Sequence, residues 1–189
     1  MPKGNDRRVR KTRAQLRGAL AQLMEEKSIQ DITVKELCEV CDINRGTFYL
    51  HYTDVYDLLH SVERELQSGF EAVLAGFSLE RLAVEPGLAM REIFEYLAAN
   101  ADMCRVLLCR GGDMAFVEGV EAVVKEHILG QWRKVFEGRD EAYEYVFAFV
   151  AGGCIGILQR WLENGMPQPP AQIARLAENI VSRGIAALQ

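Results

Sequence analysis

A short segment near the N-terminus combines side chains that can contact nucleic acid. Arg45, Thr47, Tyr49 and His51 alternate along seven consecutive residues, with Gly46 between the first two. An arginine guanidinium can read the edge of a guanine, and threonine can contact a base or a thymine methyl group. Threonine and tyrosine hydroxyls can bond phosphate, and a glycine would allow close approach to the duplex. These residue types predict contacts with double-stranded DNA.

Two short helices joined by a tight turn would position this segment. Thr33 and Glu36 form a Thr-x-x-Glu capping box, and Asn44 is a natural N-cap for the second helix. The apolar positions that such a compact unit buries are Leu37, Cys38, Cys41, Ile43 and Phe48. This is the layout of a helix-turn-helix, whose second helix lies in the major groove of DNA. Thr33 and Lys35 could also hold a phosphate at the start of the first helix.

The net charge of −5 alone argues against a nucleic-acid partner, but the charges are unevenly distributed. Residues 1–20 contain seven basic groups and one acidic group, a net charge of +6, whereas residues 61–189 carry −6. A basic end on an acidic body suits a protein that places only that end on phosphates. The alternative is a basic tail that is merely solvated.

Composition predicts a soluble protein with a sizeable core. The chain has 189 residues, of which 49% are apolar, enough for one large domain or two small ones. It has no run of about 18 uncharged apolar residues, so no membrane span is expected. The N-terminus is polar and basic, without the apolar segment of a secretory signal. We therefore expect a cytoplasmic location.

Helical periodicity runs through nearly the whole sequence, and no region alternates at period two. The sequence predicts an all-α fold of about nine helices. Seven of them cover approximately residues 7–26, 54–74, 86–97, 101–108, 113–136, 140–164 and 170–188, and the other two are the short helices that begin at Thr33 and Asn44. Asp54 is expected to cap the fourth helix, and Gly165 to end the eighth. Residues 1–58 would form a three-helix DNA-binding domain, and residues 59–189 a larger helical effector and dimerisation domain.

Three stretches together resemble the TetR family of bacterial transcriptional regulators: Ile32–Cys38, Arg45–Tyr52 and Asp57–Leu59. The resemblance covers about residues 7–62. It implies that the residues at or near DNA are Thr33, Lys35, Asn44, Arg45, Thr47, Tyr49, His51 and Tyr52. Tyr49 and His51 would be the usual phosphate contacts. Tyr52 would be partly core, since the family commonly has phenylalanine there.

Two positions depart from the family pattern. Asp42 stands in the turn where the family often has glycine, and aspartate tolerates a left-handed backbone better than most residues. Val55 stands where the family often has a lysine that meets phosphate. We expect that contact to be missing or to be supplied elsewhere, for example by the basic N-terminal arm.

The C-terminal part resembles a narrower, Firmicutes-type subgroup of the same family, through the stretch Phe149–Gly165. That subgroup includes an activator of dihydroxyacetone kinase genes, which responds to partner proteins rather than to a small ligand. The nature of the effector therefore stays open. The residues expected to line a ligand cavity, if there is one, are Phe94, Leu97, Met103, Leu107, Met114, Phe147 and Trp161. Plain core packing is the alternative for each of them.

Gly152 and Gly156 lie four residues apart and would let another helix approach closely. With Ile173, Leu176 and Ile180 of the last helix, they are candidates for a dimer interface. The family resemblance implies that two such helix pairs form a four-helix core in a homodimer. Packing within one chain is the alternative.

The cysteines suggest core packing more than chemistry. Five cysteines at irregular spacings do not predict a disulfide framework. Cys38 and Cys41 could be half of a zinc or redox site, but no second pair accompanies them. Cys104 and Cys109 lie near arginines, which can lower a thiol pKa, so a redox sensor is an alternative. No catalytic triad, phosphate-binding loop or metal triad stands out, and we expect neither an enzyme nor a cofactor.

These observations predict a homodimeric, sequence-specific regulator of transcription. It would more often be a repressor that binds a palindromic operator and is controlled by an effector at its C-terminal domain. An activator controlled by a partner protein and a thiol-based redox sensor are the alternatives.

Overall fold

The computed structural model describes residues 3–77, 86–109, 114–135 and 140–186, in which the chain forms helices joined by short connections and has no strand. The prediction of an all-α fold with about nine helices is confirmed. The elements are α1 (Lys3–Glu26), a 3₁₀ turn (Ile29–Asp31), α2 (Val34–Cys41), α3 (Arg45–Tyr49), α4 (Val55–Ala75), α6 (Pro86–Ala99), α7 (Ala101–Leu108), α8 (Met114–Val135), α9 (Asp140–Glu163) and α10 (Pro170–Ala186).

The chain divides into two compact units, Met1–Leu66 and Gln67–Gln189, so the division falls inside α4. The expected boundary lay a little earlier, between residues 58 and 59. The functional assignment of the two expected domains stays a prediction.

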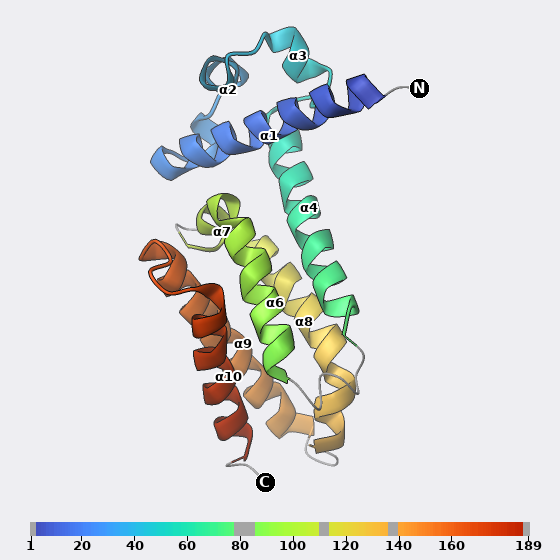
Figure 1. Cartoon of the computed structure of the whole chain (residues 1–189), viewed down its shortest axis with the longest axis vertical. Coiled ribbons are helices and arrows are strands. Elements are labelled where there is room, and N and C mark those ends of the chain that lie inside the picture. Colours follow the sequence, from blue (N-terminus) through green and yellow to red (C-terminus); the bar gives the residue numbers. More distant parts are fainter. Residues whose placement is uncertain (1–2, 78–85, 110–113, 136–139, 187–189) are drawn as a thin grey trace. The chain divides into compact units, whose positions relative to one another are not determined.

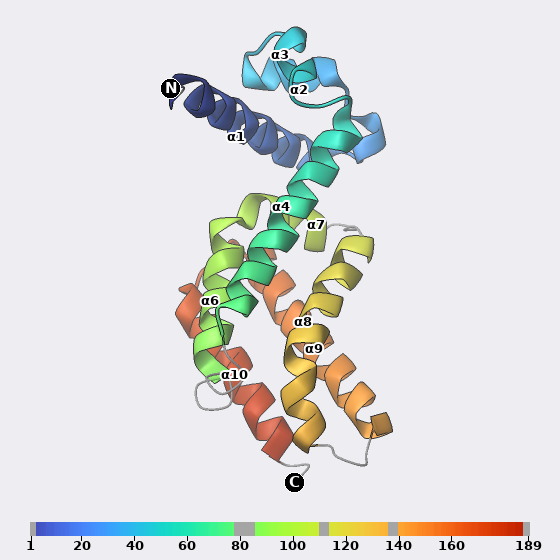
Figure 2. The same ribbon diagram turned by 90° about the vertical axis from the view of Figure 1, so that its right-hand side faces the viewer.

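The first unit is a small helical body around one apolar cluster. Leu16 and Leu20 of α1, Leu37 of α2, Phe48 of α3 and Leu58 of α4 are all fully buried. Helix α2 packs across α1, and α3 follows α2 after a tight turn (Figures 1 and 2). Each helix of this unit therefore contributes at least one side chain to the same core.

Helix α1 is longer than the sequence predicted. It begins at Lys3 rather than near Arg7, so much of the basic segment is helical and is not an unstructured tail. Its buried face includes Leu16, Ala19 and Leu20, which recur at the spacing of one helix face. The 3₁₀ turn between α1 and α2 was not predicted.

The second unit is a bundle in which α6 and α10 run side by side (Figures 1 and 2). Phe94 of α6 and Trp161 of α9 are both buried, with ring centroids 5.8 Å apart. The last turns of α4 pack on α8 through Phe70, Leu74 and Val123. These contacts give the second unit its own core.

The end of α9 follows the sequence prediction closely. The helix stops at Glu163, and Gly165 adopts a positive φ of 75°. Its amide donates to the carbonyl of Leu162, and the amide of Met166 donates to the carbonyl of Trp161 at 2.9 Å. This pair of bonds is a Schellman motif, in which glycine is preferred because it lacks a Cβ atom.

Helix α9 is also unusually apolar for an exposed helix. By length and composition alone, Glu144–Glu163 could cross a membrane, which the sequence reasoning did not expect, and only 22% of this stretch is buried. However, its uncharged run, residues 145–159, is about 23 Å long, shorter than the roughly 30 Å hydrocarbon layer of a bilayer. Helix α9 therefore leaves much of its apolar surface exposed.

Candidate nucleic-acid interface

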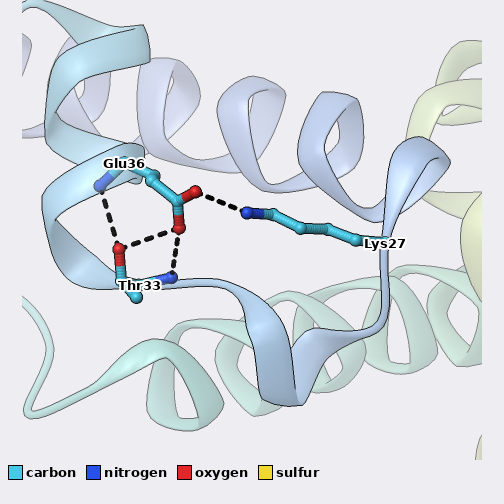
Figure 3. Close-up of polar contacts among 3 residues, drawn as sticks. All are labelled: Lys27, Thr33 and Glu36. Atoms are coloured by element: carbon cyan, nitrogen blue, oxygen red, sulfur yellow. Dashed lines mark hydrogen bonds and ion pairs between the residues drawn. The ribbon is translucent and has the colours of Figure 1, made fainter.

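The start of α2 is held by a network of three side chains (Figure 3). The Thr33 amide and hydroxyl both donate to Oε2 of Glu36, at 3.0 and 2.8 Å. The Glu36 amide donates back to the Thr33 hydroxyl at 3.3 Å, which completes the predicted capping box. Lys27, just after α1, donates to the other carboxylate oxygen of Glu36 at 2.5 Å. The network ties the end of α1 to the start of α2.

This network affects the expected phosphate contact at Thr33. The hydrogen bond from Lys27, followed by those from Thr33, lowers the pKa of Glu36 from 4.5 to about 2. A carboxylate therefore occupies the N-terminus of α2 at neutral pH, and the Thr33 hydroxyl already donates to it. Both facts argue against Thr33 as a phosphate ligand. Lys35 is exposed, with its ammonium 3.8 Å from Glu39, and remains a candidate contact.

The turn between α2 and α3 depends on Asp42. Its φ of 53° and ψ of 47° are left-handed, as expected for a residue that replaces glycine there. The Ile43 amide donates to the carbonyl of Cys38 at 3.0 Å and closes the turn. The Asp42 position thus redirects the chain toward α3 without a glycine.

Helix α3 is short and is set by its N-cap. Oδ1 of Asn44 accepts a hydrogen bond of 2.7 Å from the amide of Gly46. A Cβ at Gly46 would lie 3.3 Å from that oxygen, which is tighter than an ordinary contact. Gly46 therefore leaves room for the cap, a second reason for glycine beside the close approach to DNA that we expected.

The predicted DNA-contacting side chains of α3 have different exposures. Arg45 is exposed and Tyr49 is 58% exposed, while Thr47 and His51 are half-buried. Beneath them, Phe48 is fully buried and meets the Tyr49 ring edge to face, with centroids 5.5 Å apart. The core residue thus fixes the direction of its neighbour.

Tyr52 belongs to the core rather than to the exposed face. It is 6% exposed, and its ring centroid lies 5.9 Å from that of Phe48. Burial raises the pKa of its phenol, while a hydrogen bond with Ser61 opposes that shift. Its expected place at or near DNA is therefore not supported, although the expectation that it is partly core agrees with the structure.

Two exposed residues near α3 escaped the sequence reasoning. Leu50 is 80% exposed at the end of α3, and Tyr56 is 46% exposed in the first turn of α4. Val55 is buried, so it offers no phosphate contact, whereas the hydroxyl of Tyr56 can reach one. The sequence could have pointed to Tyr56, because it directly follows Val55, where the family often has a phosphate-binding lysine. Asp54 caps α4 as predicted, accepting from the amide of Asp57 at 2.8 Å.

The basic residues of α1 lie on the solvent side of a folded helix. The exposed ones with described side chains are Arg7, Arg8, Arg10, Lys11 and Arg13. These exposed cations give α1 a basic surface, which suits contacts with phosphates.

The cysteines of the first unit pack in its core. Cys38 and Cys41 are buried, and the Cys41 thiol donates to the carbonyl of Gln15 at 3.3 Å. Burial raises the pKa of Cys41 to about 11. Among the described residues, no group of three histidine, cysteine or acidic side chains could hold a metal ion. The structure therefore favours packing over a half zinc or redox site.

The candidate redox pair is also unfavourable for chemistry. Cys104 is 1% exposed. Burial, assisted by Glu163, raises the pKa of Cys109, and its thiol donates to the carbonyl of Gln159 at 3.7 Å. Because the thiolate is the reactive form, both environments argue against a peroxide sensor.

The residues expected to line a ligand cavity mostly lie in the core of the second unit. Phe94, Met103, Leu107, Phe147 and Trp161 are buried, and Leu97 is half-buried. Met114 is 68% exposed at the start of α8, a position that does not suit the lining of an internal cavity. Helical periodicity could not show which side of α8 is covered.

A groove of about 360 Å³ lies instead between α9 and α10, which we call the α9–α10 groove. It is lined by Tyr145, Val146, Phe149, Val150, Gly153, Cys154, Ile157, Ala177, Ile180 and Val181. Of the residues expected at a dimer interface, Gly152, Gly156, Leu176 and Ile180 are exposed, and Ile173 is half-buried.

Comparison with known proteins adds a decisive observation. A TetR family model, described as a transcriptional regulator C-terminal region, matches residues 86–183, just over half of the chain. The chain belongs to the TetR family of transcriptional regulators. Members of this family bind DNA and typically act as dimers; they are not enzymes. The resemblance seen in the N-terminal motif and the independent match of the C-terminal part agree.

Individual proteins also resemble parts or the whole of the chain. The HTH-type transcriptional regulator YxbF of Bacillus subtilis is 35% identical over 66 residues, which are 34% of this chain and 17% of that protein. The chain thus spans only about a sixth of the length of that relative. Among solved structures, the fatty acid degradation regulator FadR from Bacillus halodurans has a TM-score of 0.63 at 15% identity, covering 90% of this chain and 94% of FadR. The dihydroxyacetone kinase operon activator DhaS has a TM-score of 0.60 at 15% identity, covering 93% of this chain and 97% of DhaS. At these identities the two structures share the fold alone.

Proposed function

We propose that this member of the TetR family is a cytoplasmic homodimeric repressor that binds a near-palindromic operator. In each protomer α3 enters the major groove, where Arg45 and Thr47 contact bases. Tyr49, His51, Lys35 and the basic surface of α1 contact phosphates. The observation that carries this proposal is the exposure of Arg45 and Tyr49 on a helix fixed by the Asn44 cap and the buried Phe48.

The geometry and charge of these side chains suit them to different contacts with DNA. The guanidinium of Arg45 can make a bidentate contact to guanine, which selects sequence. Tyr49 offers one hydroxyl, which suits a phosphate and positions the helix without reading bases. The cations of α1 add attraction that does not depend on sequence and that weakens with salt.

The homodimer is supported by the exposed surface of α9 and α10. These helices have 24 and 17 residues, so they are about 36 and 26 Å long. With helix diameters of about 10 Å they present a face of roughly 600 Å² in projection, which leaves room for a second copy to pack on them. Residues 145–159 of α9 are uncharged, so two identical copies would not repel each other there.

An effector at the C-terminal unit would control the distance between the two α3 helices. It can do so only by binding one dimer conformation more tightly than another. A small ligand that enters the bundle is the first candidate effector.

A second candidate function is an activator controlled by a partner protein. The contact between the Phe94 and Trp161 rings fills part of the interior where a small ligand would bind. Helical packing of this kind favours an input at the surface. A library of metabolites that leaves the melting temperature unchanged supports this version, whereas one that raises it supports the ligand-controlled repressor.

The test of the main proposal is DNA binding to the region upstream of the protein's own gene. We expect a footprint with two halves whose centres lie about 34–36 Å apart, and binding that weakens as salt rises. Selection from a genomic pool provides an unbiased version of the assay. The absence of any sequence preference in that pool would contradict the proposal.

A further inference from the structure

Four residues of α9 form a stripe whose two halves differ in size. Tyr145, Phe149, Gly152 and Gly156 are spaced by four, three and four residues, which keeps them on one helix face. Tyr145 is 78% exposed and Phe149 is 76% exposed. The two glycines are exposed as well. One half of the stripe therefore projects large rings, and the other half has no side chains.

The two glycines are not explained by packing within the described part of the chain. A Cβ atom at either position would meet nothing within 4 Å. At Gly69, by contrast, a Cβ would lie against the ring of Tyr96. A glycine inside a helix destabilises it relative to alanine, so open glycines in α9 call for a reason outside the protomer. Gly18 of α1 and Gly153 of α9 are open too, but α1 has no aromatic residue and Gly153 lies off the stripe.

We propose that α9 packs antiparallel on α9 of the partner subunit in one defined register. Phe149 packs on Gly152 of the partner subunit, and Tyr145 packs on Gly156 of the partner subunit. The two-fold axis then passes between residues 150 and 151. This inference rests on the homodimer of the proposed function and specifies which residues meet in it.

Size complementarity selects this arrangement over a parallel one. In a parallel pair, each residue would face its own copy, so ring would meet ring and glycine would meet glycine. The antiparallel pair instead places every exposed ring of the stripe over a position with no Cβ atom. In antiparallel coiled coils, such alternating layers are the natural consequence of a seam spaced by four and three residues.

The charge distribution along α9 agrees with this register. The two-fold axis lies near the middle of the uncharged run 145–159, so the helices cross where neither has a charge. Arg160 and Glu163, which are 3.6 Å apart, lie beyond the crossing and stay at its edge. An interface with an apolar centre and a polar rim is the usual anatomy of a protein contact.

An exchange of the two residue types tests the register directly. Sedimentation equilibrium would measure the dimer dissociation constant of the full chain. We expect Gly152→Phe to raise it by about tenfold or more, because the added ring collides with Phe149 of the partner subunit. The double variant F149G/G152F moves the ring to the other side of the same contact. It should return to within about threefold of the original value.

The matched control is F149G/G156F, which has the same composition as the first double variant. Its ring and glycine are not partners in the proposed register, so its dissociation constant should stay raised. Rescue by this control, or no rescue by F149G/G152F, overturns the register. If the unsubstituted chain is a monomer, or partitions into membranes, the homodimer of the proposed function fails as well, so the two failures are distinguishable.

Cross-linking provides a second measurement that avoids large substitutions. Both chains carry Cys109→Ser and Cys154→Ser to remove the partly exposed native thiols. A mixture of Phe149→Cys chains with tagged Gly152→Cys chains should form a mixed disulfide dimer under mild oxidation. Phe149→Cys with tagged Gly156→Cys should form much less. Equal yields in the two mixtures overturn the register.

Discussion

The face around α3 and the face of α9 both expose aromatic rings, but the residues that surround these rings differ. Around α3, local contacts set the direction of the exposed groups. Asn44 caps the helix at the amide of Gly46, and the buried ring of Phe48 packs against the ring of Tyr49. Along α9, Tyr145 and Phe149 stand beside open glycines. A face that contacts DNA must present polar groups in set directions. A face that contacts another protein needs shape, which rings and glycines supply together.

The strongest way to separate the two faces is to remove the core of the first one. Phe48→Ala should destabilise the N-terminal unit by about 3–5 kcal/mol, because a fully buried ring is lost. Chemical denaturation would measure the loss, and DNA binding should disappear with it. The dimer should survive at concentrations where α9 and α10 remain folded. Leu50→Ala is the control, since an 80% exposed side chain should change stability by less than about 0.5 kcal/mol.

Two alanine variants on the α3 face should distinguish base reading from phosphate binding. Arg45→Ala should cost about 1–3 kcal/mol of binding to the preferred operator and relax the preference at one base position. Tyr49→Ala should weaken binding to all sequences alike. Binding to a set of operators with single base changes measures both effects. An equal loss on every sequence for Arg45→Ala would show that it contacts phosphate.

The turn before α3 offers a smaller change in the opposite direction. Asp42→Gly should stabilise the protein by about 0.5–1 kcal/mol, because glycine adopts the left-handed conformation without strain. Asp42→Ala, at the same position, should destabilise it. Thermal unfolding would measure both, and DNA binding by the glycine variant should remain unchanged. Stabilisation by alanine would mean that the turn is not left-handed in solution.

The Glu36 network should appear as a dependence of stability on pH. Because folding lowers the pKa of Glu36 from 4.5 to about 2, its contribution is complete above about pH 4.5 and is lost as pH falls toward 2. Glu36→Gln should therefore lower the melting temperature at pH 7 and flatten its fall between pH 5 and 2. Glu39→Gln, on the same helix, removes one charge and serves as the control. A parallel shift at all pH values would contradict the role of the ionised carboxylate.

The smallest expected effect concerns the thiols. Cys109→Ser should leave DNA binding within about twofold of the original, with or without peroxide, because a partly buried thiol with a raised pKa forms little thiolate. Gel shifts after peroxide treatment would measure this. A response to peroxide that vanishes in Cys109→Ser would revive the redox sensor.

Local signals made much of the N-terminal unit predictable. The caps at Thr33, Asn44 and Asp54 each involve residues two or three positions apart, so the sequence carries them directly. The tie from Lys27 to Glu36 joins two elements across a turn that was not predicted. It therefore could not be read from spacing.

Burial on a shared face was harder to predict. Helical periodicity shows which residues lie together on a helix, but not which neighbour covers them. Met114, expected to line a cavity, therefore proved to be exposed. For the same reason, Gly152 and Gly156 suggested close helix contact without showing that no atom of the described protomer fills the space beside them.

The brevity of α3 limits how much information one protomer can extract from DNA. With five residues, of which Arg45 and Thr47 are the candidate base readers, a half-site would specify about two base pairs. Two half-sites then distinguish about 256 sequences, far fewer than the roughly 10⁶ competing sites of a bacterial genome. In the proposed dimer the remaining selectivity would come from the spacing between half-sites and from the deformability of the DNA between them. Such a regulator would recognise the shape and flexibility of its operator as much as its base sequence.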